Sequence, residues 1–417
     1  MGNDNKPTLV GGSCIIACIC VGAGMLGLPA AGSGAWTFWS ILALAGVMVI
    51  MVLSGCLLLE ALKSYPIRSS FSTVTKDLLG HRVAWVNNLA VYFVGAILLY
   101  AYTTSSGLIL QEYIKVNAQV SSVLFVLLFS AFVWYSTRLV DRASFVLLIF
   151  MIFTFSFSVS GLVSGIRVDS LYGKFDIGQT KYLLSFLPIA LTAFGFHHAV
   201  SSMRDYYLDE YSSQKAIVGG AIIAFVVYAV WIVSIYGNID RGSFVDINAA
   251  GGNVDSLLAA IDERVVDNTL SIVIGAFSAA AILSSFIGVG LGVFDFIADA
   301  FQFSADRVGR TKTWAVTFLP PLLFSLFFPF GFISSIGYAS LFAAIWACII
   351  PVLLVRKVRT EQVTTPITNN QYHHTWQPSQ YRCFGGSLSL LLVFVFGVTI
   401  ILIHLFDLIN LIPKFGF

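Results

Sequence analysis

Two short glycine-bearing runs interrupt apolar segments, one in each half of the chain, and both expose backbone groups that could bind a ligand. They are Gly22–Gly24 and Phe194–Phe196. Inside a membrane, backbone groups that no helix satisfies are tolerated only where they line a cavity or bind something. A half-helix beginning near Met25 would direct N–H groups and a positive dipole end at a carboxylate. A half-helix ending near Cys20 would offer carbonyl groups to an ammonium group or a cation.

A ligand that carries both charges suits such a pair of breaks. An α-amino acid zwitterion presents a carboxylate to the N–H groups and an ammonium group to the carbonyls. Paired breaks in corresponding segments are also a sequence pointer to the substrate site of secondary transporters. Phe194 and Phe196 would add an apolar wall for a bulky side chain, or they pack in the core. The alternative interpretation is two ordinary membrane helices that contain glycine.

Ionisable residues in apolar segments are the next candidates for chemistry. His197 and His198 directly follow the second break. A histidine there could hydrogen-bond a substrate or carry a proton, because its ordinary pKa is near neutral. A structural hydrogen bond to the loosened backbone is the competing interpretation. Asp295 and Asp299 share one helix face, and their position near a helix end also suits solvation or pairing with nearby arginines.

A cation site is a further hypothesis from the same segments. Ser284 and Ser285 lie in an apolar run. Their hydroxyl groups could join the carbonyls of Cys18 and Val21 around a small hard cation, which prefers oxygen ligands. Serines in membrane helices also hydrogen-bond to neighbouring helices, so both interpretations stay open.

The composition places these runs in a lipid bilayer. The 417 residues are 58% hydrophobic and 11% charged, with a mean hydropathy of +0.87, whereas soluble domains carry about 25% charged residues. The net charge of +2 gives no reason to expect a nucleic-acid partner. No spacing typical of a metal protease and no polar catalytic constellation occurs, so we expect neither an enzyme nor a cofactor.

Runs of about 20 apolar residues define membrane spans, and the sequence predicts an all-α membrane protein with eleven of them. They cover 8–34, 36–63, 83–113, 118–136, 142–166, 181–202, 214–238, 268–302, 312–328, 332–356 and 385–411. The broken segments begin the first and the sixth span, and four further spans follow each. This order predicts a single domain, 1–417, with a five-plus-five inverted repeat. Its halves cover about 8–166 and about 181–356, and a further helix covers about 385–411.

The positive residues predict the orientation in the membrane. With a cytoplasmic N-terminus, 16 lysines and arginines fall on the cytoplasmic side and 7 on the outer side. Cytoplasmic loops carry the excess of positive residues. The N-terminus is therefore expected in the cytoplasm and, with an odd number of spans, the C-terminus outside.

Several longer segments resemble the bacterial hydroxy and aromatic amino acid permeases, which belong to the amino acid–polyamine–organocation superfamily. The resemblance implies a leucine-transporter-like fold and proton-coupled import of an aromatic L-amino acid, tyrosine first, across the bacterial inner membrane. The matching segments are Val21–Pro29, Leu57–Glu60, Thr192–His197, Ser285–Asp299, Phe318–Leu322 and Gly337–Ala339.

The family resemblance also implies which residues form the site. Tyr102 matches the family's tyrosine in the third span. The substrate-binding residues are expected to be Gly22, Ala23, Gly24, Met25, Tyr102, Phe194, Gly195, Phe196 and His197. The candidates for ion coupling are His197, Cys18, Val21, Ala281, Ser284, Ser285 and Asp295.

The coupling ion is expected to be a proton, but two features point toward sodium. Some relatives carry a lysine in the fifth span that stands in for sodium, and here Met151 occupies about that position. The spacing from Ala281 to Ser284 and Ser285 resembles the sodium site of sodium-coupled relatives. A sodium-coupled symporter is therefore the first alternative, and a non-transporting amino acid sensor or a channel is the second.

Overall fold

The computed structural model describes residues 7–416 except 68, 173–175, 264–267, 305, 329–330 and 362–378. These residues form helices and connecting turns, with no strand among them. Nine described helices are long and apolar enough to cross a membrane, and a bent pair near the N-terminus forms a tenth span. The chain is therefore an all-helical, multi-pass membrane protein, as the sequence predicts.

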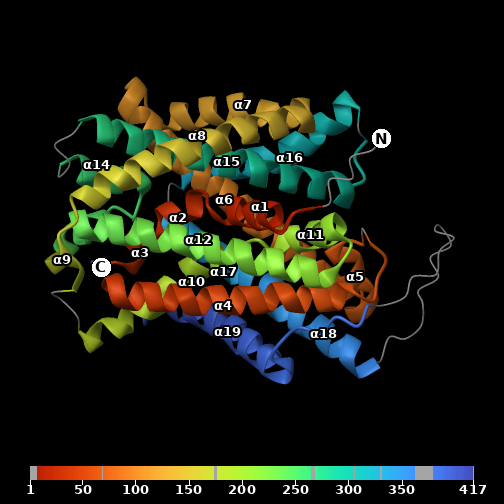
Figure 1. Cartoon of the computed structure of the whole chain (residues 1–417). Helices are drawn as coiled ribbons and strands as arrows, with labels where there is room; N and C mark the ends of the chain where they lie inside the picture. The colour runs from red at the N-terminus through yellow and green to blue at the C-terminus, as the bar shows by residue number, and fades with distance from the viewer. Residues whose placement is uncertain are drawn as a thin grey trace, which may run out of the picture.

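The membrane helices follow the predicted spans closely and lie side by side in a bundle (Figure 1). Three of the predicted spans are interrupted, and they consist of α1–α3, of α10 with α11, and of α17 with α18. The elements are α1 (Leu9–Cys20), α2 (Ala23–Leu26), α3 (Leu28–Gly32), α4 (Trp36–Leu62), α6 (His81–Ile114), α7 (Ala118–Tyr135), α8 (Thr137–Ser164), α10 (Leu183–Ala193), α11 (Val200–Tyr207), α12 (Glu210–Asn238), α15 (Asn268–Ala300), α16 (Arg307–Phe327), α17 (Phe332–Ala344), α18 (Ile350–Glu361) and α19 (Gly386–Leu408).

The predicted count of eleven spans is not confirmed, because the ninth differs from the others. α16 occupies the predicted span 312–328 but begins earlier, at Arg307. Its first turns carry several cations, so it is not among the described helices that are apolar enough to cross. Asp306 caps α16, and hydrogen bonds from the Ser304 hydroxyl and the Gly309 N–H lower the pKa of its carboxyl group. α16 nevertheless packs along α6, α7 and α15 within the bundle.

Several short helices occur where the sequence indicates only loops. α5 (Phe71–Leu79) follows α4, and the Ser70 side chain caps it by accepting from the Thr73 N–H at 3.1 Å. α9 (Val168–Tyr172), α13 (Phe244–Ala249) and α14 (Val254–Asp262) lie between longer helices. Their one-sided apolar pattern is too short to stand out from the long runs beside them. Most of the segment between α18 and α19 lies outside the described residues.

The helices pack reciprocally between the two halves of the chain. α1 packs along α12, and α10 packs along α4, so each broken segment contacts the helix that follows the other. In the same way α15 contacts α8 while α6 contacts α17, and α6 pairs with α7 while α15 pairs with α16. A five-plus-five inverted repeat would produce exchanges of this kind. The symmetry operation that relates the two halves stays a prediction.

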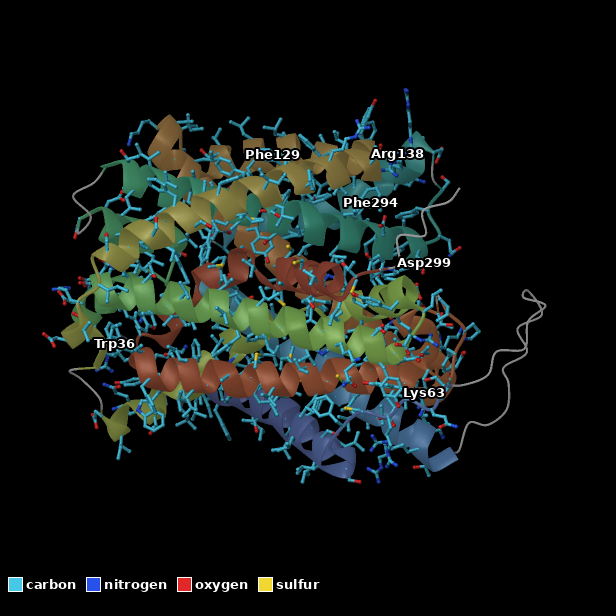
Figure 2. The ribbon with its side chains drawn as sticks, in the orientation of Figure 1. Trp36, Lys63, Phe129, Arg138, Phe294 and Asp299 are labelled. Carbon is cyan, nitrogen blue, oxygen red and sulfur yellow. The ribbon has the colours of Figure 1, made fainter. Side chains whose placement is uncertain are left out.

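The sides of the bundle are apolar. Figure 2 places Lys63, Arg138 and Asp299 toward one end and Trp36 toward the other. Large apolar side chains such as Phe145 and Phe153 on α8 are exposed on the outside of the bundle, and further ones line α7 and α19. An apolar surface of this extent suits contact with lipid chains.

Candidate functional site at the two helix breaks

The first break bends the chain sharply at Gly22. α1 ends at Cys20, α2 begins at Ala23, and the two half-helices differ in direction by 57°. Gly22 is extended, with φ −153° and ψ −154°, and its carbonyl accepts from the Met25 N–H at 3.1 Å. The sequence indicated that the second half-helix begins near Met25. In the structure it begins two residues earlier, at Ala23.

The second break is a short irregular turn within one continuous span, Ile177–Tyr207. α10 ends at Ala193, residues Phe194–Phe196 turn, and a short 3-10 helix, His197–Ala199, leads into α11. The Phe194 N–H donates to the Leu191 carbonyl at 3.1 Å, and the Phe196 N–H donates to the Phe194 carbonyl at 3.0 Å. The chain therefore loses the regular helical hydrogen bonds at this break. Unlike the first break at Gly22, it does not bend sharply here.

The two breaks lie against each other at the centre of the bundle. A Cβ added to Gly24 would lie 3.6 Å from the Ala193 Cα. On α12, the fully buried Tyr228 places its hydroxyl oxygen 2.6 Å from the Cys20 carbonyl oxygen and 2.7 Å from that of Ala193. The carboxyl ends of both half-helices therefore converge on one phenol, which sequence reasoning did not single out.

Ser285 connects the first break to α15. Its hydroxyl accepts from the Ala23 N–H at 3.0 Å, and it lies beside the buried Tyr102 side chain. A Cβ on Gly22 would lie only 2.5 Å from the Ser285 Oγ, so this close approach requires glycine. The structure therefore brings together Gly22, Ala23, Tyr102 and Ser285, all of them predicted site residues.

His197 lies in a buried aromatic pocket beside the second break. Its ring stacks on Phe196, with centroids 4.9 Å apart, and meets the edge of Trp346 at 5.7 Å. Both ring nitrogens of His197 and the Trp346 Nε1 are buried without a hydrogen-bond partner among the described residues. Buried polar atoms are rarely left unpaired, and those that are call for an explanation. A ligand or a water could hydrogen-bond to these three atoms, and the imidazole could also take up a proton.

Trp346 is also placed by an irregularity in its own helix. Residues Ile345–Ile349 form a π-helical turn between α17 and α18, and such turns are frequent at functional sites. The Ser54 hydroxyl of α4 donates to the Ala347 carbonyl in this turn. Nothing in the apolar run marks a π-turn, so Trp346 had no sequence signal beyond its aromatic ring with a polar tip.

Other predicted residues are not brought to the same point. Asp295 is exposed and lies ten residues beyond Ser285, which is about 15 Å along a helix. Ser284 makes no hydrogen bond to the first break among the described residues, and the Cys18 side chain is exposed.

The side chains of two predicted residues at the breaks, Phe194 and Met25, are fully buried. Phe194 packs its ring against Tyr228 at 5.2 Å, as the packing interpretation had it.

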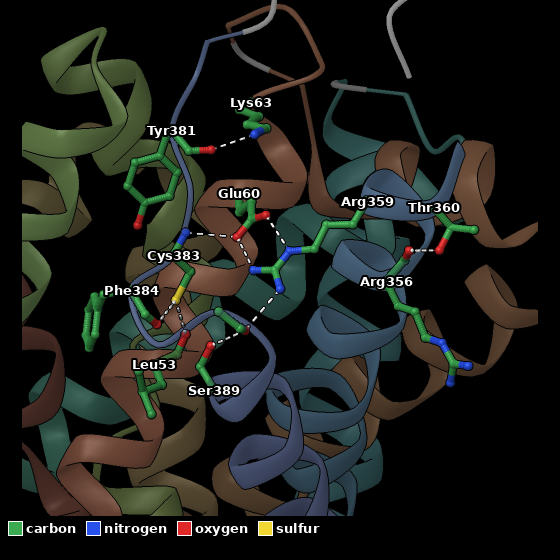
Figure 3. Close-up of polar contacts among 11 residues, drawn as sticks. Leu53, Glu60, Lys63, Arg356, Arg359, Thr360, Tyr381, Cys383, Phe384 and Ser389 are labelled. Atoms are coloured by element: carbon green, nitrogen blue, oxygen red, sulfur yellow. Dashed lines mark hydrogen bonds and ion pairs between the residues drawn. The ribbon is translucent and has the colours of Figure 1, made fainter. Parts of the chain in front are cut away.

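A second polar cluster lies near the Lys63 end of the bundle (Figure 3). The buried Glu60 of α4 forms a two-point ion pair with Arg359 of α18, with both N–O distances 2.8 Å. The Glu60 carboxylate also accepts from the Cys383 N–H at 2.9 Å, and Arg359 donates to the Gly386 carbonyl at 3.0 Å. This cluster attaches the start of α19 to α4 and α18, away from the helix breaks.

Comparison with known proteins decides the class to which this site belongs. A sequence model of the tryptophan/tyrosine permease family matches residues 5–404. The chain belongs to this family. It is 40% identical over 413 residues to a tryptophan-specific transport protein of Haemophilus influenzae, covering 95% of this chain and 96% of that one. It is 33% identical to a tyrosine permease of Enterobacter agglomerans, covering 98% of both chains. The predicted family is thereby confirmed, and this permease is a transporter rather than an enzyme.

The fold is shared with solved transporter structures that differ widely in sequence. MHP1, a nucleobase-cation-symport-1 family transporter in a closed conformation, matches with a TM-score of 0.59 at 13% identity. The match covers 98% of the permease and 95% of the MHP1 chain. At this identity the likeness concerns the fold alone. The predicted transporter architecture is confirmed at that level.

Proposed function

We propose that this permease is a symporter that imports an aromatic L-amino acid across the bacterial inner membrane by alternating access. The single observation that carries the proposal is the convergence of the two helix breaks on one another. The Cys20 and Ala193 carbonyls face one point and are suited to the substrate ammonium group. The backbone around Gly22–Gly24 is suited to its carboxylate, because the half-helix beginning at Ala23 points its positive dipole end there.

The aromatic ring of the substrate is assigned to the His197 side of the breaks. A phenol or an indole N–H needs a hydrogen-bond partner when it is buried. A neutral His197 offers one unpaired ring nitrogen as an acceptor for either group, and the unpaired Trp346 N–H can donate to a phenol oxygen. Tyrosine is the substrate expected from the sequence. The 40% identity to a tryptophan-specific protein favours tryptophan as the second candidate.

We assign coupling to a proton carried by His197, with the N-terminus in the cytoplasm. The place of His197 directly after the second break and its two unpaired ring nitrogens support this assignment, because histidine is the side chain that ordinarily gains and loses a proton near neutral pH. Sodium is the alternative, held by the Cys18 and Val21 carbonyls with Ser284 and Ser285. The orientation is supported by Lys63 and Arg138 at one end of the bundle, since positive residues favour the cytoplasmic side.

Uptake into proteoliposomes tests the proposal directly. Labelled tyrosine, tryptophan, phenylalanine and serine are offered under a proton gradient and, separately, under a sodium gradient. We expect tyrosine and tryptophan to accumulate under the proton gradient without sodium, and serine to remain at the background level. Loss of all uptake in sodium-free buffer would overturn proton coupling. Binding without uptake would identify a sensor, and flux that does not saturate would identify a channel.

An added methyl group is expected to lower uptake at Gly22 of the first break but not at Gly288 of α15. Gly22→Ala drives its Cβ against the Ser285 Oγ and displaces the acceptor of the Ala23 N–H. Loss of one buried hydrogen bond corresponds to a fall in uptake of about tenfold. Gly288→Ala on α15 is the matched control and should stay within about twofold, because nothing lies within 4 Å of its added Cβ. Equal effects of the two changes on initial uptake rates would contradict the assigned role of Ser285.

A further inference from the structure

Tyr228 on α12 lies between the two broken helices and connects their ends. Its hydroxyl lies 2.6 Å from the carbonyl oxygen of Cys20, the last residue of α1, and 2.7 Å from that of Ala193, the last residue of α10. The side chain is fully buried, and the ring of Phe194 packs edge-on against it. The two carbonyls belong to segments more than 170 residues apart in the chain, and this one phenol bridges them.

The number of available protons makes this bridge incomplete. A phenol has a single O–H, so Tyr228 donates to only one of the two carbonyls at a time. Carbonyls at a helix end have no partner within their own helix, and a buried carbonyl without a donor is destabilised. An ammonium group has three N–H donors and can satisfy both carbonyls at once. It is therefore the better partner for the same pair of oxygens.

We propose that Tyr228 is a positioning residue that holds the two half-helices together in the unloaded transporter and yields both carbonyls to the substrate ammonium group. This inference rests on the proposed function. A symporter completes its cycle only when the unloaded protein also changes conformation. In that step the Tyr228 hydroxyl is the donor that keeps the ends of α1 and α10 joined. In the loaded protein the ammonium group makes the connection, and the hydroxyl is dispensable.

The same helix supplies a matched control. Tyr236 lies about two turns further along α12, is also fully buried, and donates to the Pro29 carbonyl at 2.7 Å. Its ring stacks on Trp36 with centroids 4.2 Å apart. Tyr236 thus shares its helix, its burial and a phenol-to-carbonyl bond with Tyr228, but it does not bridge the two breaks. Any general cost of removing a buried hydroxyl from α12 should appear in both variants.

The experiment compares net uptake with exchange for wild type, Tyr228→Phe and Tyr236→Phe in proteoliposomes. Net uptake of labelled tryptophan or tyrosine starts from vesicles without internal substrate and needs the unloaded step. Exchange starts from vesicles preloaded with the unlabelled amino acid and needs only the loaded steps. For Tyr228→Phe we expect net uptake to fall about tenfold, the cost of one buried hydrogen bond, while exchange stays within about twofold of wild type. For Tyr236→Phe both rates should change by the same factor.

The outcomes separate this inference from the proposed function. If Tyr228→Phe lowers net uptake and exchange equally, or leaves net uptake unchanged, the bridging role is wrong while the transporter assignment stands. A selective loss of net uptake over exchange in Tyr236→Phe would also overturn the bridging role of Tyr228, because Tyr236 does not join the breaks. If wild-type protein moves no aromatic amino acid in either mode, the proposed function itself fails.

Discussion

A His197→Phe variant is expected to lose proton-driven accumulation of substrate while it still exchanges substrate across the membrane with a raised KM. The phenyl ring preserves the stacking on Phe196 and the edge contact with Trp346, so the packing of the break is retained. The substitution removes the two buried ring nitrogens that have no hydrogen-bond partner among the described residues. A benzene ring binds no proton, whereas an imidazole does so near neutral pH.

The measurement is the ratio of internal to external substrate at steady state. With one proton per substrate, a pH difference of one unit supports about tenfold accumulation, since about 1.4 kcal/mol corresponds to a factor of ten. Wild type should approach that ratio, and His197→Phe should reach about one. His198→Phe is the control and should behave as wild type, because the His198 side chain is exposed. Full accumulation by His197→Phe would exclude this histidine as the carrier and favour sodium.

Glu60→Ala is expected to destabilise the protein strongly without touching the helix breaks. The change leaves the Arg359 guanidinium, whose side chain is only 17% exposed, without its carboxylate. It also removes the acceptor of the Cys383 N–H. Breaking a buried ion pair by removing one partner typically costs about 3–5 kcal/mol. We expect a marked fall in the midpoint of thermal unfolding in detergent and a lower yield of folded protein in the membrane.

Two further variants isolate the cause of this destabilisation. Glu60→Gln retains an oxygen acceptor for the Cys383 N–H but removes the charge, so its unfolding midpoint should lie between those of wild type and Glu60→Ala. Arg167→Ala breaks the ion pair with Asp240, whose side chains are 50% and 42% exposed, and pairs of this kind contribute about 0–1 kcal/mol. A Glu60→Ala protein as stable as Arg167→Ala would show that the cluster does not anchor α19.

The amino-acid sequence alone determined the features of this permease that depend on short stretches of chain. A run of apolar residues specifies a membrane helix, because every backbone group inside the bilayer must be paired within the segment. The prediction 36–63 therefore agrees with α4, Trp36–Leu62. The break at Gly22 was equally visible, since a glycine-rich interruption of an apolar run is a local signal. α16 departed from its prediction because its polar first turns lie outside the apolar run that was used to find it.

Contacts between distant segments were decided only by the tertiary structure. Tyr228 and Trp346 stand in apolar runs where nothing nearby distinguishes them from packing residues. Tyr228 gains its role only when α12 packs along α1 and brings the Cys20 carbonyl within 2.6 Å across 208 residues of chain. Ser285 was a candidate cation ligand from its sequence position, and only the fold shows that its hydroxyl also accepts from the Ala23 N–H. Hydrogen-bond partners are set by which helices are in contact and by how far each is shifted along its axis. Both depend on the packing of the whole bundle.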